Sequence, residues 1–148
     1  MAGPCVEILV PRRVSTSDEL RIRAVIESVA STVEGNDFWI AKRPFLVRFE
    51  EPDSEAASLV LSGWSPKGTV SFCAMTNTYS DHVLLAVLGF RTAQLLDGLI
   101  VLDDISTITS DPSVLTFEGA RPVDGYGYIV SPDFLGYWLS HPDFRLLK

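Results

Sequence analysis

The sequence predicts an α+β fold, a ferredoxin-like sandwich in which two main helices pack on one face of a mostly antiparallel sheet. Two observations support this class. Apolar residues recur at helical spacing in two separate segments, and short apolar runs rich in β-branched and aromatic residues lie before, between and after them. A helix pair on one face of a sheet buries both amphipathic stripes at once. The 148 residues fit one domain, residues 1–148, with a strand and a short helix added at the C-terminal end.

The expected centre of the core is the segment from Ser80 to Asp104. Several of its leucines fall within one arc of roughly 120° on a helical wheel, which predicts a helix with one buried face. These are Leu84, Leu85, Leu88, Leu95 and Leu96. Ser80 or Asp81 can cap the start of this helix, and Gly98 ends it. The run from Leu99 to Leu102 predicts a strand that is buried on both faces and lies antiparallel to the helix, in contact with it.

The chain before this segment predicts a strand followed by a helix. The first strand is Val6 to Val10. A helix should follow from about Asp18 to Ser31, because Thr16 and Glu19 have capping-box spacing and apolar residues recur on one face. The residues of that face are Ile22, Val25, Ile26 and Val29, and Gly35 and Asn36 should break the helix.

More strands are expected between the two helices. The aromatic and aliphatic runs of residues 38–49 predict a bent or interrupted second strand around Pro44. Residues 50–55 are an acidic turn. Two apolar runs between Ala56 and Asn77 flank the turn Ser65–Gly68, which is typical of a hairpin.

The chain after the central segment is less regular. Residues 106–119 predict a loop with one irregular strand at most. A strand should follow from Tyr126 to Val130, and then a short helix from Pro132 to Ser140. The many large apolar side chains of the tail indicate that it is docked, with Phe144 and Leu146 on one side of a strand added to a sheet edge.

Charge and hydropathy exclude several classes of partner. Twelve basic and nineteen acidic side chains give a net charge of −7, which repels a phosphate backbone, so nucleic acid is not an expected ligand. The longest apolar run, Val83 to Phe90, is far shorter than a membrane span. Cys5 and Cys73 form no CxxC pair and no secretion signal is visible, so we expect a cytoplasmic protein in which Cys73 is a small buried hydrophobe.

The titratable residues predict no catalytic, metal or cofactor site. The two histidines are 59 positions apart, and a Cys73–His82 nucleophile and base would need a geometry that spacing cannot show. Asp97, Asp103 and Asp104 could supply oxygens to a hard cation, but their spacing matches no metal loop. Residues 125–127, Gly-Tyr-Gly, lack the further glycine and the lysine of a phosphate-binding loop.

One enzymatic alternative stays open. A small hydrolase or transferase could use His82 with Asp81, or His141 with Asp143, as a base and its orienting carboxylate. The other candidates for function are aromatic side chains, which can anchor a protein interface but are also expected in the core. These are Trp39, Trp64, Phe134, Tyr137, Trp138 and Phe144.

The end of the chain carries the most specific motif. Residues 138–148 read WLSHPDFRLLK, which resembles the C-terminal signature WLxHPDFRxxK of a family of small uncharacterised bacterial proteins. Asp81-His82 with the Leu-rich helix and Gly98-Leu99-Ile100 resemble the DHxLL…GGLI segment of the same family, with Asp97 where a glycine is common. The resemblance covers residues 77–102 and 131–148, and the rest of the chain matches in general layout.

The resemblance implies an immunity-type protein, because such proteins look like the small acidic factors that bacteria make beside polymorphic toxins. We therefore expect a protein that binds and neutralises a partner toxin domain, with complementary charge favouring a basic one. No catalytic residues carry over from the resemblance, and the oligomeric state stays open. The residues expected to contact the partner are Glu50, Glu51, Asp81, His82, Asp103 and Asp104.

Overall fold

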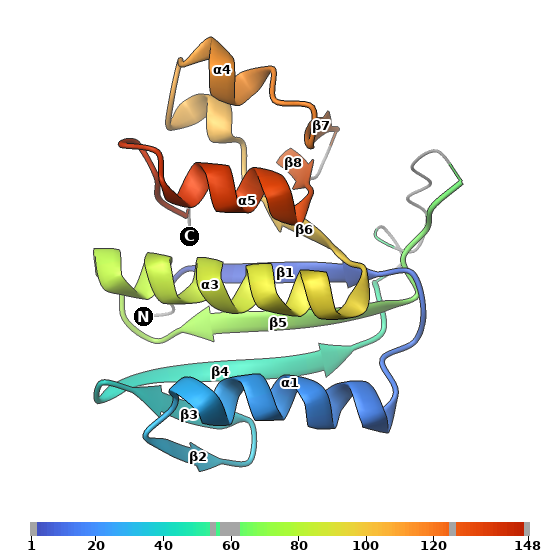
Figure 1. Ribbon diagram of the computed structural model, residues 1–148, viewed down its shortest axis with the longest axis vertical. Coiled ribbons are helices and arrows are strands. Elements are labelled where there is room, and N and C mark those ends of the chain that lie inside the picture. Colours follow the sequence, from blue (N-terminus) through green and yellow to red (C-terminus); the bar gives the residue numbers. More distant parts are fainter. Residues whose placement is uncertain (1–2, 54–55, 57–62, 125–126, 147–148) are drawn as a thin grey trace.

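The computed structural model describes residues 3–53, 56, 63–124 and 127–146. An eight-stranded antiparallel sheet with the order β2-β3-β4-β5-β1-β6-β8-β7 forms its centre, and the three longer helices cover one face of that sheet (Figure 1). The strands are β1 (Cys5–Val10), β2 (Thr32–Glu34), β3 (Asp37–Ile40), β4 (Arg43–Glu50), β5 (Gly68–Ala74), β6 (Leu99–Leu102), β7 (Ala120–Val123) and β8 (Gly127–Val130). The helices are α1 (Thr16–Val29), α3 (Tyr79–Leu96), α4 (Pro112–Leu115) and α5 (Pro132–Leu139), with a 3₁₀ turn η1 (Ile105–Thr107).

The predicted α+β class is confirmed. When the β2–β3 hairpin is left out, the elements β1, α1, β4, β5, α3 and β6 have the β-α-β-β-α-β order of a ferredoxin-like unit. Their four strands lie side by side as β4-β5-β1-β6. The β2–β3 hairpin extends one edge of this unit, and β8 and β7 extend the other (Figure 1).

The capping box of helix α1 lies one residue earlier in the chain than expected. The side chain of Ser15 accepts a hydrogen bond from the Asp18 N–H, and the Asp18 side chain bonds back to the Ser15 N–H. Ser15 thus takes the place predicted for Thr16, and the helix ends at Val29 rather than at Ser31. The expected face is correct, because Ile22 and Ile26 are buried and Val25 and Val29 pack beside them.

Helix α3 packs on the sheet through the predicted leucine stripe. Leu85, Leu88 and Leu96 are buried, and Leu84 and Leu95 lie partly buried against the same core. Its cap is Thr78, with Asp81 in the third helical position, rather than Ser80. A Cβ on Gly98 would lie 2.7 Å from Cγ2 of Ile8, so only glycine lets the chain turn this close to β1.

Strand β6 confirms the predicted contact between this helix and the strand after it. Ile100 and Leu102 face the main core, whereas Leu99 and Val101 pack in a smaller cluster on the opposite face of the sheet. Leu9, Ala56, Trp64, Val123 and Ile129 complete that cluster. The strand is therefore covered on both faces, although Leu99 and Val101 keep part of their surface in solvent.

Two predictions about the strands between the helices were wrong in detail. The bent second strand is a hairpin, β3 and β4, whose turn residues Ala41 and Lys42 have φ values of 49° and 65°. Gly35 and Asn36 do not break α1, since they form the turn between β2 and β3. In the predicted hairpin about Ser65–Gly68, the second strand is β5, and the first strand falls on residues 57–62, outside the described residues.

The C-terminal tail is docked, as predicted, but it is not a strand. Trp138, Phe144 and Leu146 are buried, with the rings of Trp138 and Phe144 6.0 Å apart. The tail lies against α3 instead of extending a sheet edge, because the backbone N–H of Leu146 donates to His82 Nδ1. The expected loop of residues 106–119 contains η1 and α4, and β7 follows it.

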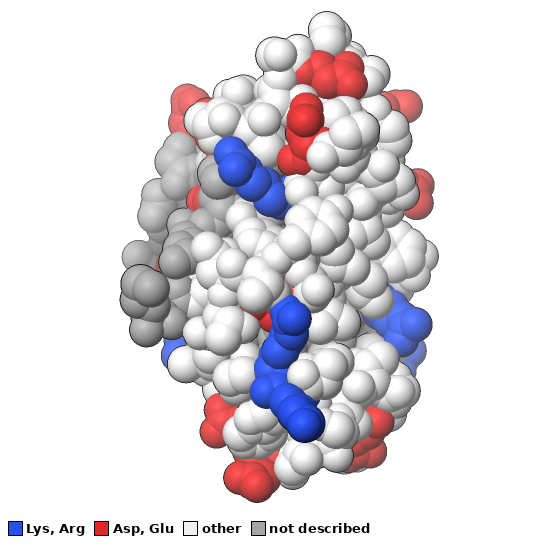
Figure 2. All heavy atoms as spheres, turned by 90° about the vertical axis from the view of Figure 1, so that its left-hand side faces the viewer, with Lys and Arg blue, Asp and Glu red and all other residues white. Residues whose placement is uncertain are grey.

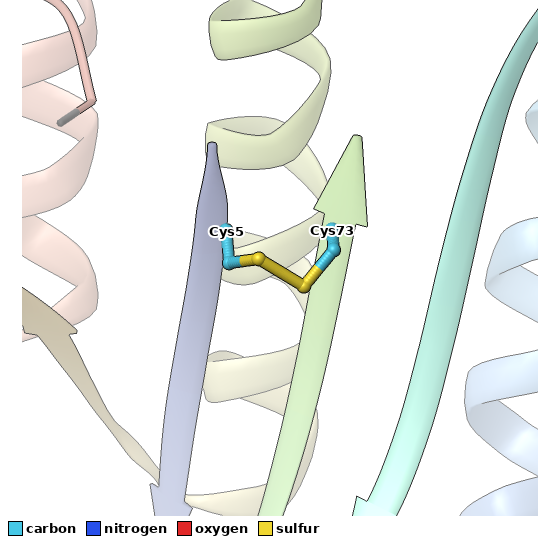
Figure 3. The surroundings of a disulfide bond; sticks show 2 residues. All are labelled: Cys5 and Cys73. Carbon is cyan, nitrogen blue, oxygen red and sulfur yellow. A yellow bond between two sulfur atoms is a disulfide. The ribbon is translucent and has the colours of Figure 1, made fainter. Parts of the chain in front are cut away.

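The two cysteines form a disulfide between adjacent strands, which corrects the expectation for Cys73. The register places Cys5 of β1 directly opposite Cys73 of β5. Figure 3 shows the bond on the face of the sheet that α3 does not cover. We call this side the open face, and Ala56 and Trp64 cover part of it. Alternation along β1 also puts Glu7 and Leu9 there, while Val6, Ile8 and Val10 enter the core.

Candidate functional site

A cavity of about 170 Å³ opens where β1 and β6 stop pairing. The last paired residues are Glu7 and Val101, and beyond them the two strands separate. Continued pairing would have put Cys5 opposite Asp103, and both residues line the cavity instead. Its apolar wall consists of Val101, Leu102, Ile105, Ile108, Trp138 and Leu146. The docked tail therefore closes one side of the cavity.

Four polar groups of this cavity have no hydrogen-bond or ion-pair partner among the described residues. Three are the charged side chains of Glu7, Asp103 and Arg145. The fourth is Trp138 Nε1, which is buried. A buried indole N–H normally finds an acceptor. The cavity is thus a mixed site, with an apolar wall and unpaired charges of both signs.

The carboxyl of Glu7, which lines this cavity, has a raised pKa. Partial burial raises the pKa of its carboxyl, and the negative charges of Asp53 and Glu50 raise it further. Glu50 and Asp53 each act on Glu7, and we call these three residues the acidic cluster. Glu50 is opposite Thr69, which is opposite Leu9, so the register places Glu50 on the open face with Glu7.

The residues that we expected to contact a partner do not form one surface. Glu50 and Glu51 lie at the end of the sheet where Val10 pairs with Gly68. Asp103 and Asp104 follow β6 at the opposite end, beside Cys5. All four side chains are exposed, and Glu51 forms an ion pair of 3.7 Å with Arg13. These four residues therefore form two separate acidic sites rather than one.

Asp81 is fully buried at the start of α3. Its Oδ2 accepts hydrogen bonds from the Thr78 N–H at 2.8 Å and from the Thr76 hydroxyl at 2.7 Å. Arg43 lies 3.3 Å from its Oδ1. Burial acts to raise the pKa of this carboxyl, but these hydrogen bonds outweigh burial and hold the pKa below its usual value. Asp81 therefore holds the start of the helix and presents no surface to a partner.

His82 is also an internal residue. Its Nδ1 accepts from the Leu146 N–H at 2.8 Å, so the proton of the neutral ring is on Nε2, which donates to Asn77 Oδ1 at 2.9 Å. Burial lowers the pKa of His82, against the effect of Asp81, and Arg145 lowers it further. Both ring nitrogens are therefore occupied, and the imidazole is held neutral.

His141 joins a second hydrogen-bonded group near the end of α5. Its Nδ1 accepts from the Asp143 N–H at 3.0 Å, and its Nε2 donates to Asp111 Oδ2 at 2.9 Å. The bond from His141 lowers the pKa of Asp111 to about 2. Ser113 donates to the other oxygen of Asp111 at 2.8 Å, so the hydroxyl of Tyr137, 2.9 Å from Ser113 Oγ, must be the donor between them.

This second group contains the residue types of a hydrolase but not their arrangement. In a serine hydrolase the imidazole accepts the proton of the nucleophile, whereas here the carboxylate lies between Ser113 and His141. The unprotonated ring nitrogen of His141, Nδ1, already accepts a hydrogen bond from the Asp143 N–H. The described part of the chain also holds no group of three His, Cys, Asp or Glu side chains that could bind a metal ion.

The surface at the start of α3 differs from the open face in charge. Figure 2 shows that this end of the molecule is largely uncharged, with basic side chains near the middle and acidic side chains toward the two extremes. Tyr79 and Met75 are its large exposed apolar residues, at 62% and 50% exposure. The acidic cluster does not lie here, since Glu50 is at the other end of β4 from Arg43.

Of the polar residues that line the cavity, Asp103 and Trp138 were among the candidates named from the sequence, whereas Glu7 and Arg145 were not. Glu7 looked like an ordinary polar position in a strand, and Arg145 like a residue of the tail. One signal was available: a glutamate within an otherwise apolar strand faces the side opposite to its neighbours. Only the fold brings residues 7, 103 and 145 to the same cavity, because they come from three distant segments.

None of the helices in the described part of the chain has the length and apolar content that a bilayer crossing requires.

Comparison with known proteins gives a family but no function. No curated protein and no solved structure matches the chain. The profile of a family of unknown function, DUF6368, matches residues 2–148, which is almost the whole sequence. The chain therefore belongs to the DUF6368 family.

Proposed function

We propose that this chain is an immunity-type protein of bacterial origin that binds and neutralises a basic toxin domain through the open face of its sheet. The observation that carries the proposal is the acidic cluster of Glu7, Glu50 and Asp53, three carboxylates close enough that two of them raise the pKa of the third. Like charges that remain together at a surface favour a cationic partner, and they increase its association rate.

The rest of the open face carries charges of both signs, so the acidic cluster supplies its excess of negative charge. Cross-strand register places the acidic side chains of Glu34 and Asp37 on this side as well, with Arg48 and Arg121 as basic side chains. A basic surface with apolar residues among its cations would match both the carboxylates and the half-buried Trp39 and Leu46. Of the partner-binding residues expected from the sequence, Glu50 belongs to this surface by register, and Glu51 follows it beyond the end of β4.

Two of the partner-binding residues expected from the sequence, Asp81 and His82, are internal and have another role in this proposal. Asp81 and His82 keep the start of α3 and the tail in place, and therefore support the fold behind the binding face. Asp103 and Asp104 lie at the far end of the sheet, where they could contact only a partner that spans its whole length. The enzymatic alternative with His82 or His141 as base is less well supported, because both ring nitrogens of each histidine already have partners.

The compartment is part of the proposal. The sequence led us to expect the cytoplasm, where disulfides are rare because thioredoxin and glutathione keep thiols reduced. The Cys5–Cys73 bond is the kind of feature that an oxidising compartment preserves. Rapid alkylation of thiols in intact cells, followed by mass spectrometry of the purified chain, would show which form the cell contains.

Co-expression with the toxin domain encoded beside this gene tests the proposal. The two chains should co-purify as a complex that persists at micromolar concentration, and cells that carry both should survive expression of the toxin. Separate elution of the two chains, with no protection of the cells, would refute an immunity function.

A further inference from the structure

The cavity between β1, β6 and the tail has the properties of a small ligand site. Its floor is apolar and buried, since Leu102, Ile105 and Trp138 are at most 5% exposed. Its mouth carries the exposed side chains of Asp103 and Arg145. Apolar walls with a few placed polar groups are typical of small-molecule sites.

The charged groups of the cavity are complementary to a ligand that carries a positive and a negative charge. Glu7 and Asp103 would attract a cation, and Arg145 an anion. Glu7 comes from β1 and Asp103 follows the end of β6, and both line the same cavity, so one ammonium group can lie between the two carboxylates. Arg145 comes from the tail on the other side, and no ion pair joins it to either carboxylate among the described residues.

The buried indole is a second and independent observation. Trp138 has no exposed surface, and its Nε1 has no acceptor in the part of the chain that the structure describes. An unpaired buried N–H costs free energy that a bound acceptor would recover. Because Trp138 lines the cavity, a ligand there is placed to supply that acceptor.

We propose that this cavity binds a free amino acid with an aliphatic side chain. The ammonium group lies between Glu7 and Asp103, and the carboxylate pairs with Arg145 and accepts from the Trp138 indole. The aliphatic side chain packs on Val101, Ile105 and Leu146. This assignment gives each unpaired charge a partner of opposite sign and gives the indole N–H of the floor an acceptor.

The size of the cavity agrees with this class. A cavity of about 150 Å³ holds a molecule as large as benzene, so a volume of about 170 Å³ suits a ligand of roughly six to nine non-hydrogen atoms. Valine and leucine fall in this range. Nucleotides and peptides do not, because they are several times larger.

Nuclear magnetic resonance of the isolated protein tests the proposal without any toxin partner, so its outcome is independent of the proposed function. The indole N–H resonance of Trp138 is identified by elimination, using the variants Trp39→Phe and Trp64→Phe. Each probe is then titrated to about 10 mM, which detects a Kd of millimolar order or tighter. The probes are L-leucine, 3-methylbutylamine, 4-methylpentanoate and 3-methylbutan-1-ol.

L-leucine should shift the Trp138 indole resonance, and the amine and the acid should bind at least about tenfold more weakly, because each carries only one of the two charged groups of the amino acid. Arg145→Gln and Asp103→Asn should each weaken leucine binding by a similar factor, while Arg121→Gln, an exposed arginine of β7, should not. No shift with leucine at the highest concentration would overturn the proposal. Equal binding of the neutral alcohol, or unchanged affinity in Arg145→Gln and Asp103→Asn, would overturn it as well.

Discussion

The backbone N–H of Leu146 donates a hydrogen bond of 2.8 Å to Nδ1 of His82, a bond between residues that lie 64 positions apart in the chain. It is buried, and it fixes the last described residue of the tail against the first turn of α3. The bond needs the neutral imidazole, because a protonated ring has no lone pair to offer. The docking of the tail is therefore tied to the charge of one histidine.

Stability should fall with decreasing pH because of His82. Its pKa is lowered in the folded protein, so the unfolded chain takes up the proton first as pH falls below about 6.5. The contribution of His82 to the free energy of unfolding is fully present above about pH 6.5. It is lost as the pH falls toward the lowered pKa, by at most about 1.4 kcal/mol per pH unit. Urea unfolding between pH 8 and pH 5 should show this slope in the natural protein, and a flatter one in His82→Gln. Parallel curves for the two proteins would show that another group is responsible.

Deleting residues 140–148 should destabilise the whole domain. Phe144 is 2% exposed and Leu146 is 5% exposed, and their loss would also leave Nδ1 of His82 buried without a donor. We expect a loss of at least about 3 kcal/mol, the usual cost of removing a buried aromatic side chain. Chemical unfolding of the truncated chain measures it. If that chain melts like the full-length protein and fails only to hold its partner, the tail is a recognition element instead.

Leu88→Ala tests the packing of α3. Leu88 is 2% exposed within the main core, so truncation should lower the free energy of unfolding by about 2–5 kcal/mol. Leu20→Ala is the matched control on α1, since Leu20 is 63% exposed and the same truncation should cost less than about 0.5 kcal/mol. A change below about 1 kcal/mol for Leu88→Ala would contradict the packing.

The disulfide should contribute substantially to stability. Cys5 and Cys73 are 68 positions apart, and restricting an unfolded loop of this length is worth about 4 kcal/mol in the chain-entropy description. Unfolding of the oxidised protein should therefore require more denaturant than unfolding of Cys5→Ser/Cys73→Ser. Two reactive thiols in the oxidised protein, measured under denaturing conditions without reductant, would mean that the bond does not form.

The sequence was a good guide to features that depend on local periodicity. The leucine stripe of α3 and the apolar face of α1 were found because residues three and four positions apart share a face whatever the rest of the chain does. The exact caps were missed, since Ser15 and Thr16, or Thr78 and Ser80, are chemically equivalent acceptors only one or two residues apart. The hairpin turn at Ala41 and Lys42 was missed because neither residue is typical of a left-handed backbone.

The site depends on relations that a sequence does not show. The disulfide follows from the register of β1 on β5, and a shift of one residue would have pointed the two thiols to opposite faces. Glu7, Asp103, Trp138 and Arg145 come together only because β1 and β6 separate and the tail turns back over the gap. The acidic cluster, likewise, joins β1 to residues more than forty positions away.

The affinity of the toxin domain for this protein, measured with two matched pairs of substitutions, tests the central claim most directly. Glu50→Gln/Asp53→Asn removes two charges of the acidic cluster and spares Glu7, which lines the cavity. Glu27→Gln/Glu118→Gln removes two exposed charges outside the cluster, one of them on α1. At low salt the first pair should weaken binding by about tenfold, mainly through a slower association rate, and the second pair should change it by less than about twofold. Equal effects of the two pairs, or none from the first, would contradict a partner held by the acidic open face.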